Sequence, residues 1–194
     1  TIGKLSPSGL SRRTIQLGEL FSFDSYPYSS SDILPQLLHE HQTGFVNQVV
    51  EAAYKYRSYM HEDGGKLSPA HAEEMRNTTK LLTRYILFAD EAPLPEGKIK
   101  GDPQYKKDFL ASRKNLPGGE SLRDFDLQTR LFKHRCSYMI YSGVFQGLAP
   151  EYKTQVFQSL AKALDTQSPD PDYSYLPDGE KIVIKKLLQT TLPK

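Results

Sequence analysis

The fold of this chain is decided by residues 120–148, which read ESLRDFDLQTRLFKHRCSYMIYSGVFQGL. This stretch contains no proline and is dense in large apolar and aromatic side chains. Ser121 stands three residues before Asp124, a spacing that resembles a capping box with Asp in place of the more common Glu. The stretch therefore predicts a central helix that begins at Ser121 and is kinked at Gly143.

A helical wheel divides this predicted helix into a solvent-facing edge and a buried arc. The solvent-facing edge is a narrow, mainly charged sector made of Arg123, Asp126, Arg130, Lys133 and Ser137. The remaining circumference is mostly apolar, except for one polar strip made of Asp124, Gln128, Arg135 and Ser142. A buried charge needs a partner, so each charged group of the strip should meet one on another element. Interhelix salt bridges are the commoner cause of such a pattern, and the alternative is a polar seam that faces a ligand or a partner.

The rest of the chain predicts further helices separated by proline and glycine. Apolar residues that recur every three or four positions, together with capping residues, predict helices over about 31–63, 68–89, 102–113, 149–164 and 177–191. Residues 1–30 hold repeated Pro, Gly, Ser and Thr and only short apolar pieces, which predicts an extended arm or linker laid over the domain. We find no period-2 strand pattern. We therefore expect an all-α, single-domain bundle of five or six helices over residues 31–194.

Composition narrows the class of protein. A chain of 194 residues suits one domain, and 38% hydrophobic with 25% charged residues is ordinary for a globular protein. Lys+Arg 25 against Asp+Glu 23, with no basic block, argues against nucleic-acid binding. No apolar run approaches the roughly 20 residues that span a bilayer. The chain begins at Thr1 without an initiator Met or a signal-like segment, which indicates either a removed leader or a piece of a longer protein, and we expect the second.

Few residue patterns point to chemistry. Cys136 is the single cysteine, which excludes an internal disulfide framework and any zinc site with several thiolates. Asp90 and Glu91 form an acidic pair at a helix end, and paired carboxylates suit acid–base catalysis when their pKa values are split. Adjacent residues on a helix do not face each other, however. No nucleophile elbow, phosphate loop or dinucleotide fingerprint is present. We expect no catalysis from this segment alone; a hydrolase that uses Asp90, Glu91 and Asp124 is the least supported alternative.

Three pieces of sequence resemble the C-terminal region of large, uncharacterised bacterial proteins of the planctomycete type. They are LLHEHQT at 37–43, FADEAPLP at 88–95, and SLRDFDLQTRLF at 121–132 followed by SYMIYS at 137–142. The similarity runs from about residue 30 to the end. Some of those proteins look exported and associated with c-type cytochromes, so the resemblance implies an extracytoplasmic, periplasmic setting and haem in the wider protein. His41, His134 and Met139 are then the side chains with haem- or metal-ligand chemistry. This segment lacks a Cys-x-x-Cys-His attachment motif, so we expect no cofactor attached to it.

These observations favour a non-catalytic helical domain for docking or assembly within a larger bacterial protein. Its expected partners are another protein or other segments of the same polypeptide, with no nucleic acid and no membrane span. The alternative is an extracytoplasmic redox protein in which this domain shapes a haem or metal site.

Overall fold

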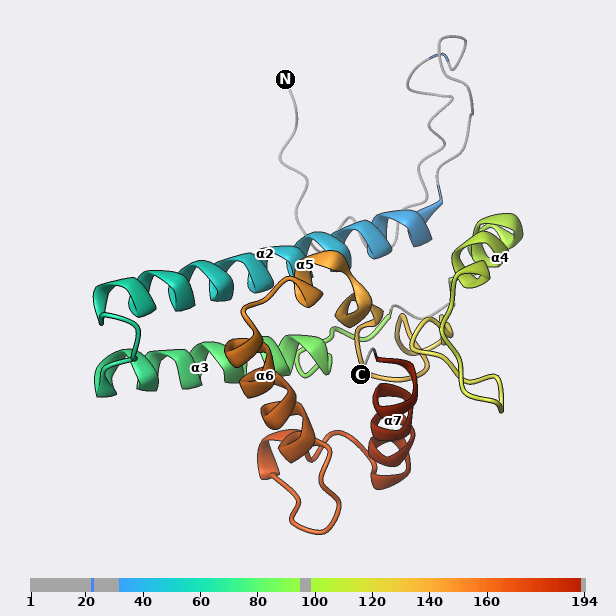
Figure 1. The fold of residues 1–194 in the computed structure, drawn as a ribbon. Helices are drawn as coiled ribbons and strands as arrows, with labels where there is room; N and C mark the ends of the chain where they lie inside the picture. Colours follow the sequence, from blue (N-terminus) through green and yellow to red (C-terminus); the bar gives the residue numbers. More distant parts are fainter. Residues whose placement is uncertain (1–21, 23–31, 95–98, 193–194) are drawn as a thin grey trace, which may run out of the picture. The chain divides into compact units, whose positions relative to one another are not determined.

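The computed structural model describes residue 22 and residues 32–94 and 99–192, and this part of the chain is all-α (Figure 1). It contains six α-helices and no strand over those ranges, which confirms the predicted fold class. The chain divides into one unit of Thr1–Asp32 and another of Ile33–Lys194, and the six described α-helices all belong to the second. The arm predicted over residues 1–30 lies outside the described residues except at Ser22.

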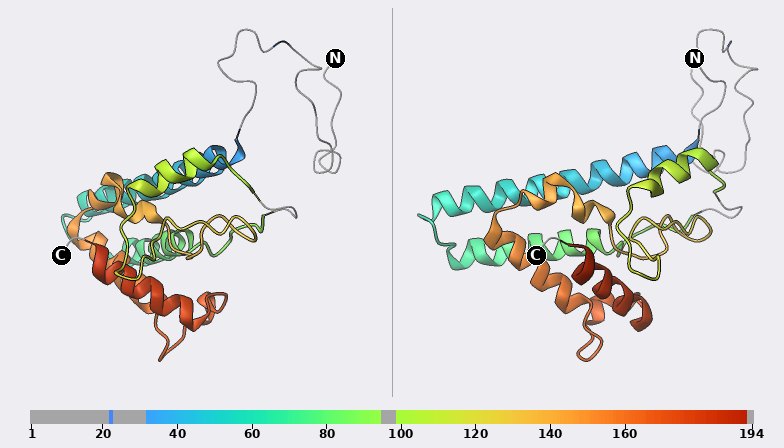
Figure 2. Two further views of the ribbon diagram at one scale, coloured as in Figure 1. Left: turned by 90° about the vertical axis from the view of Figure 1, so that its right-hand side faces the viewer. Right: turned by 45° about the vertical axis from the view of Figure 1, so that its right-hand side comes forward.

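Two long helices, α2 (Ile33–Glu62) and α3 (Pro69–Ile86), form an antiparallel hairpin and lie side by side in every view (Figures 1 and 2). Gly64 and Gly65 make the turn between them, with φ angles of 66° and 95° that favour glycine. Ser68 caps α3, because its hydroxyl oxygen accepts a hydrogen bond from the amide of His71, and Pro69 occupies the first helical position. Both helices were predicted by these local signals and are confirmed. The buried side chains of α2 recur every three or four residues: Leu34, Leu38, His41, Phe45, Val49, Ala52 and Tyr56.

Four further α-helices follow the hairpin in the described part of the chain. They are α4 (Pro103–Ala111), α5 (Gly143–Gln146), α6 (Pro150–Ala163) and α7 (Asp178–Thr191), with two short 3₁₀ helices, η2 (Tyr138–Tyr141) and η3 (Pro171–Tyr173). α6 lies on α3, where the Thr83 hydroxyl donates to the Ser159 hydroxyl oxygen at 2.9 Å. The helices predicted near 102–113, 149–164 and 177–191 are confirmed. No helix in the described part of the chain is long and apolar enough to cross a membrane.

The predicted central helix over residues 121–142 is wrong, because most of this stretch is an irregular, hairpin-like loop. Phe125 and Phe132 face each other across an isolated antiparallel bridge, and their rings stack with centroids 5.7 Å apart. Between them, the Asp126 carboxylate accepts hydrogen bonds from the amides of Gln128 and Thr129 at 2.8 and 3.2 Å. A short polar side chain that captures nearby amides in this way competes with helix formation. Helical geometry returns only in η2 and α5.

The predicted capping box exists only in part. The Asp124 carboxylate accepts a hydrogen bond from the amide of Ser121 at 2.8 Å, but the chain continues into the loop rather than into a helix.

The predicted solvent-facing edge is also wrong at two positions. Ser137 is fully buried, and the Arg123 guanidinium lies 4.9 Å from the ring centroids of both Phe109 and Tyr138.

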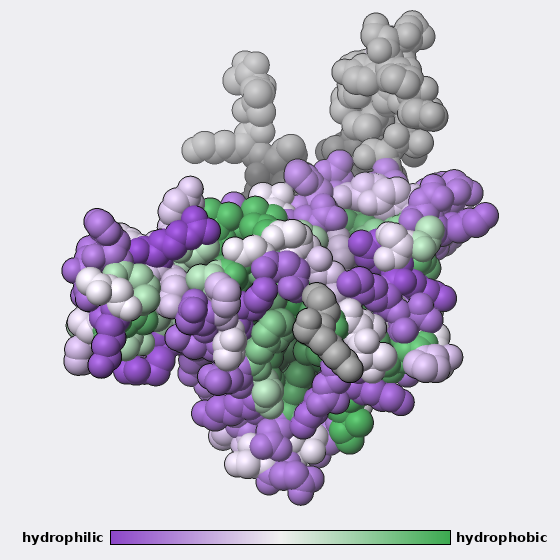
Figure 3. Space-filling model, in the orientation of Figure 1, coloured by the Kyte–Doolittle hydropathy of each residue, from purple (hydrophilic) through white to green (hydrophobic). Residues whose placement is uncertain are grey.

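The loop over residues 121–137 is a central part of the core. Leu122, Phe132 and Cys136 are almost completely buried. The loop is tied to α7 by an ion pair between Arg135 and Glu180 at 2.6 Å, in which the side chains are only 16% and 10% exposed. Figure 3 shows a mainly hydrophilic face, with apolar surface exposed near α5 and between α6 and α7.

Candidate functional site

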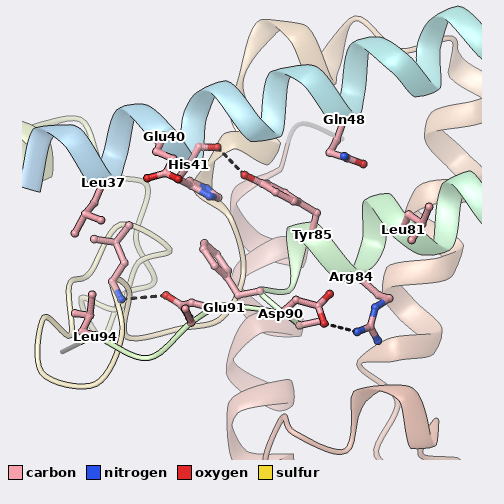
Figure 4. A pocket seen from close by; sticks show the side chains of 14 residues that line it. Leu37, Glu40, His41, Gln48, Leu81, Arg84, Tyr85, Asp90, Glu91 and Leu94 are labelled. Carbon is pink, nitrogen blue, oxygen red and sulfur yellow. Dashed lines mark hydrogen bonds and ion pairs between the residues drawn. The ribbon is translucent and has the colours of Figure 1, made fainter. Parts of the chain in front are cut away.

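A groove runs along one face of the α2–α3 hairpin, with a volume of about 530 Å³ (Figure 4). We call it the α2–α3 groove. Its lining comes from α2, from α3, from the segment that follows α3, and from Leu131 of the loop. The lining residues are Leu37, Glu40, His41, Gln48, Leu81, Arg84, Tyr85, Phe88, Ala89, Asp90, Glu91, Ala92, Leu94 and Leu131.

Helical periodicity explains why these residues share one face. Leu81 and Tyr85 are four residues apart on α3 and therefore point to the same side. Thr79 and Thr83 point to the opposite side of α3. Their hydroxyl groups donate hydrogen bonds to the hydroxyl oxygens of Tyr152 and Ser159 on α6. The groove therefore lies on the face of α3 that α6 does not cover, and Leu81 remains 62% exposed there.

His41 forms the floor of the groove and is only 8% exposed. Its ring stacks on Phe88 and Tyr85, with centroids 4.8 and 5.8 Å apart. Its Nε2 atom forms a hydrogen bond of 2.8 Å with the hydroxyl group of Ser137. The same hydroxyl oxygen accepts a hydrogen bond from the amide of Met139. Burial lowers the pKa of His41 from 6.5 to about 4, so the imidazole is neutral at physiological pH.

A glycine inside α2 lets Tyr85 reach this floor. The Tyr85 hydroxyl donates to the carbonyl oxygen of His41 at 3.1 Å and passes directly over Gly44. A Cβ atom at position 44 would overlap the hydroxyl oxygen and lie 3.0 Å from the ring carbon that bears it. Glycine in a helix interior costs roughly 0.5–1 kcal/mol relative to alanine. Here the absence of a side chain at Gly44 permits a close contact between the two helices.

Phe88 holds an unusual backbone conformation beside the groove. Its φ of 54° is in the left-handed region, at the position after a helix where glycine is common. The amide of Ala89 donates to the carbonyl of Arg84 at 3.0 Å, and the amide of Phe88 donates to that of Tyr85 at 3.2 Å, which together form a Schellman ending of α3. A bulky residue in this conformation costs about 1–2 kcal/mol. In this strained backbone conformation, the Phe88 ring stacks on His41.

The acidic pair predicted from the sequence lines the groove, but its members have separate partners. Asp90 forms an exposed ion pair with Arg84 at 2.7 Å. Glu91 is half-buried, and its Oε1 atom accepts a hydrogen bond from the amide of Leu131 at 3.1 Å. Burial raises the pKa of Glu91 by more than that hydrogen bond and nearby arginines lower it. Glu40, on the exposed side of α2, forms no ion pair with any described residue.

The polar strip expected on a central helix does not exist as one surface, since the stretch is not a helix. Asp124 caps a turn and lies 3.4 Å from the guanidinium of Arg113. Gln128 is exposed at the tip of the loop. Arg135 has its partner on α7, as described above, and Ser142 caps α5. The strip is thus three separate structural contacts and one exposed side chain rather than a seam.

Of the three residues proposed as haem or metal ligands, only His41 lines the groove. His134 is buried, and its Nε2 atom has no hydrogen-bond partner among the described residues. Burial lowers the pKa of His134 as well. Met139 is half-buried in η2. Within residues 32–94 and 99–192, no three His, Cys, Asp or Glu side chains gather as a metal site.

Sequence reasoning placed His41, Asp90 and Glu91 among its candidates but missed Gly44 and Phe88. Gly44 had a visible signal, because a glycine within a long helical stripe needs a packing reason. No protein-family model, curated protein or solved structure matches this chain. The resemblance to planctomycete-type proteins therefore stays a prediction.

Proposed function

We propose that this chain is a non-catalytic docking domain of a larger protein. Its α2–α3 groove binds a segment of another protein that carries an apolar side chain close to a Lys or Arg. The observation that carries this proposal is a groove with an aromatic floor, apolar walls and two carboxylates, Glu40 and Glu91, that form no ion pair with any described residue.

The apolar walls supply the binding energy in this proposal. Leu81 is 62% exposed at the groove, and Leu37 and Leu94 are each only partly buried. Fully covering a leucine side chain contributes about 1.5–3 kcal/mol. The aromatic rings of Tyr85 and Phe88 add a rigid surface of the kind that anchors partner side chains.

The carboxylates supply the preference for a basic partner. Arg84 is already paired with Asp90. The remaining charges in the lining of the groove are the negative charges of Glu40 and Glu91. Glu40 has no ion pair among the described residues, and Glu91 uses one oxygen for the amide of Leu131. Their remaining oxygens suit a charge-assisted hydrogen bond from Lys or Arg, and complementary charge speeds and orients association.

The reactive groups near the groove already serve structural contacts, which supports binding rather than catalysis. His41 is a weak base with a pKa of about 4 and lies in an aromatic stack. The hydroxyl group of Ser137 is buried, so a substrate cannot approach it. Cys136 is fully buried, and burial raises the pKa of its thiol, which disfavours the nucleophilic thiolate.

Site-specific photo-crosslinking in cells of the source organism tests this function. A photoreactive amino acid replaces Leu81 in the full chain, and Ile182 of α7, which is 58% exposed, is replaced in the control. We expect position 81 to capture a segment of another protein with an apolar residue beside Lys or Arg, and Glu40→Lys to reduce the capture.

Three results would contradict the proposal. One is equal capture of the same segment from position 182. Another is a captured segment without a basic residue. The third is capture of a second copy of this chain, or of its own residues 1–30, in place of another protein.

A further inference from the structure

The shape of the α2–α3 groove indicates the conformation of the segment that binds in it. Leu37, His41 and Gln48 form one stripe along α2, about 16 Å long at 1.5 Å per residue. Leu81 and Tyr85 of α3, with Phe88 just past its end, form the matching stripe. A channel between two side-by-side helices is the space that a third helix fills when its side chains pack between theirs.

The walls of the groove do not suit a peptide that binds as an added strand. Such a peptide pairs with a free sheet edge, where unpaired amides and carbonyls are available. α2 and α3 use their own backbone groups within the helices. Recognition along these two walls must therefore come from side chains, as it does when a helix docks in a groove.

Figure 4 shows the order of the groove's side chains along its length. Leu81 and Gln48 lie toward one end, and Leu37 and Leu94 lie toward the other. Glu91 lies between Leu94 and Leu81, so an acidic group separates two apolar ends.

We infer that the partner segment binds as an amphipathic α-helix of about three turns that lies along α2 and α3 as a third helix. It presents two apolar side chains about two turns apart and one Lys or Arg between them, facing Glu40 and Glu91. This inference rests on the proposed docking function. A helix of this length is marginal alone in water, so the segment gains helical structure as it docks.

A designed peptide provides the probe. It is an alanine-based peptide of about 14 residues with leucine at positions 3 and 10 and lysine at position 7, so that all three face one side. Two control peptides differ from it at one position each: proline replaces a central alanine, or glutamate replaces the lysine. Binding to the full chain is measured by fluorescence anisotropy, and helicity by circular dichroism of the mixture.

We expect the helical lysine peptide to bind about tenfold more tightly than the proline peptide and to gain helicity on binding. Leu81→Lys should abolish this binding, whereas Ile182→Lys, an equally exposed site outside the groove, should leave it unchanged. Amide chemical shifts near Ala89 and Leu131 should move on titration.

Equal affinity for the helical and proline peptides would overturn the helical inference and leave docking intact. Absence of binding by both peptides would also overturn it, while docking is judged separately by the cross-links from position 81. Equal affinity for the lysine and glutamate peptides would instead contradict the basic specificity of the proposed function.

Discussion

The Tyr85 hydroxyl donates a hydrogen bond to the main-chain carbonyl oxygen of His41 at 3.1 Å, so the two helices of the hairpin are joined at the floor of the groove. The ring that makes this bond is also stacked on the His41 imidazole. The same contact therefore holds α2 against α3 and shapes the surface that we propose as a docking site. This contact is possible only because Gly44 has no side chain.

Gly44→Ala should destabilise the protein by about 1–3 kcal/mol, because a Cβ at this position overlaps the Tyr85 hydroxyl oxygen and forces the two helices apart. Combining it with Tyr85→Phe removes that oxygen, so the double variant should be more stable than the sum of the two single changes predicts. Urea denaturation measures all three. Gly179→Ala is the control, since a Cβ there meets nothing within 4 Å, and it should not lower the stability.

Phe88→Ala and Phe88→Gly separate ring packing from backbone strain. Both variants lose the stack on His41, but only glycine adopts a φ of 54° without steric cost. Phe88→Gly should therefore be more stable than Phe88→Ala by about 1 kcal/mol. Thermal and urea unfolding compare the pair. An alanine variant as stable as the glycine variant would show that the left-handed conformation is not strained in the folded state.

The stability of the protein should fall as the pH drops from 6.5 to about 4, and His41 should account for part of this fall. The pKa of folded His41 is lowered by burial, so the unfolded chain binds more protons in this range and stability rises with pH. The contribution is complete above pH 6.5 and amounts to about 3 kcal/mol. The raised pKa of Glu91 acts in the opposite direction, because its protonated form is favoured in the folded state.

Urea denaturation at several pH values isolates the His41 contribution. His41→Gln should flatten the dependence between pH 6.5 and 4 relative to the native chain. His39→Gln changes an exposed histidine two positions away on the same helix and should leave the dependence intact. Parallel pH curves for the native chain and His41→Gln would disprove the assignment.

Glu180→Gln should destabilise the protein by about 3 kcal/mol, since it leaves the half-buried guanidinium of Arg135 without its carboxylate. Burial acts to raise the pKa of Glu180, but hydrogen bonds from the side chain and amide of Arg135 outweigh it and lower the pKa. Glu73→Gln removes an ion pair with Arg76 whose side chains are 61% and 65% exposed, and it should cost less than about 1 kcal/mol. Chemical denaturation of both variants provides the comparison, and equal losses would be inconsistent with a buried pair.

The sequence by itself determined the helices whose signals are local. The apolar spacing of α2 and the caps at Ser68 and Asp102 predict helices that the structure confirms. The sequence also placed Asp90 and Glu91 at a helix end, beside what proved to be the groove. These features depend on residues within a few positions of one another, so helical periodicity and capping chemistry are sufficient to predict them.

Only the tertiary structure decided the conformation of residues 121–142. Phe125 and Phe132 are seven residues apart, a spacing that fits one face of a helix and also the stacked pair of a hairpin-like loop. The hydrogen bonds that Asp126 accepts from nearby amides favour the loop. Arg135 binds Glu180, which lies 45 residues further along the chain, and this contact holds the loop against α7. The groove likewise requires Tyr85 to meet a carbonyl 44 residues away, over Gly44. Contacts between distant segments form only when the chain is packed, so no local pattern reveals them.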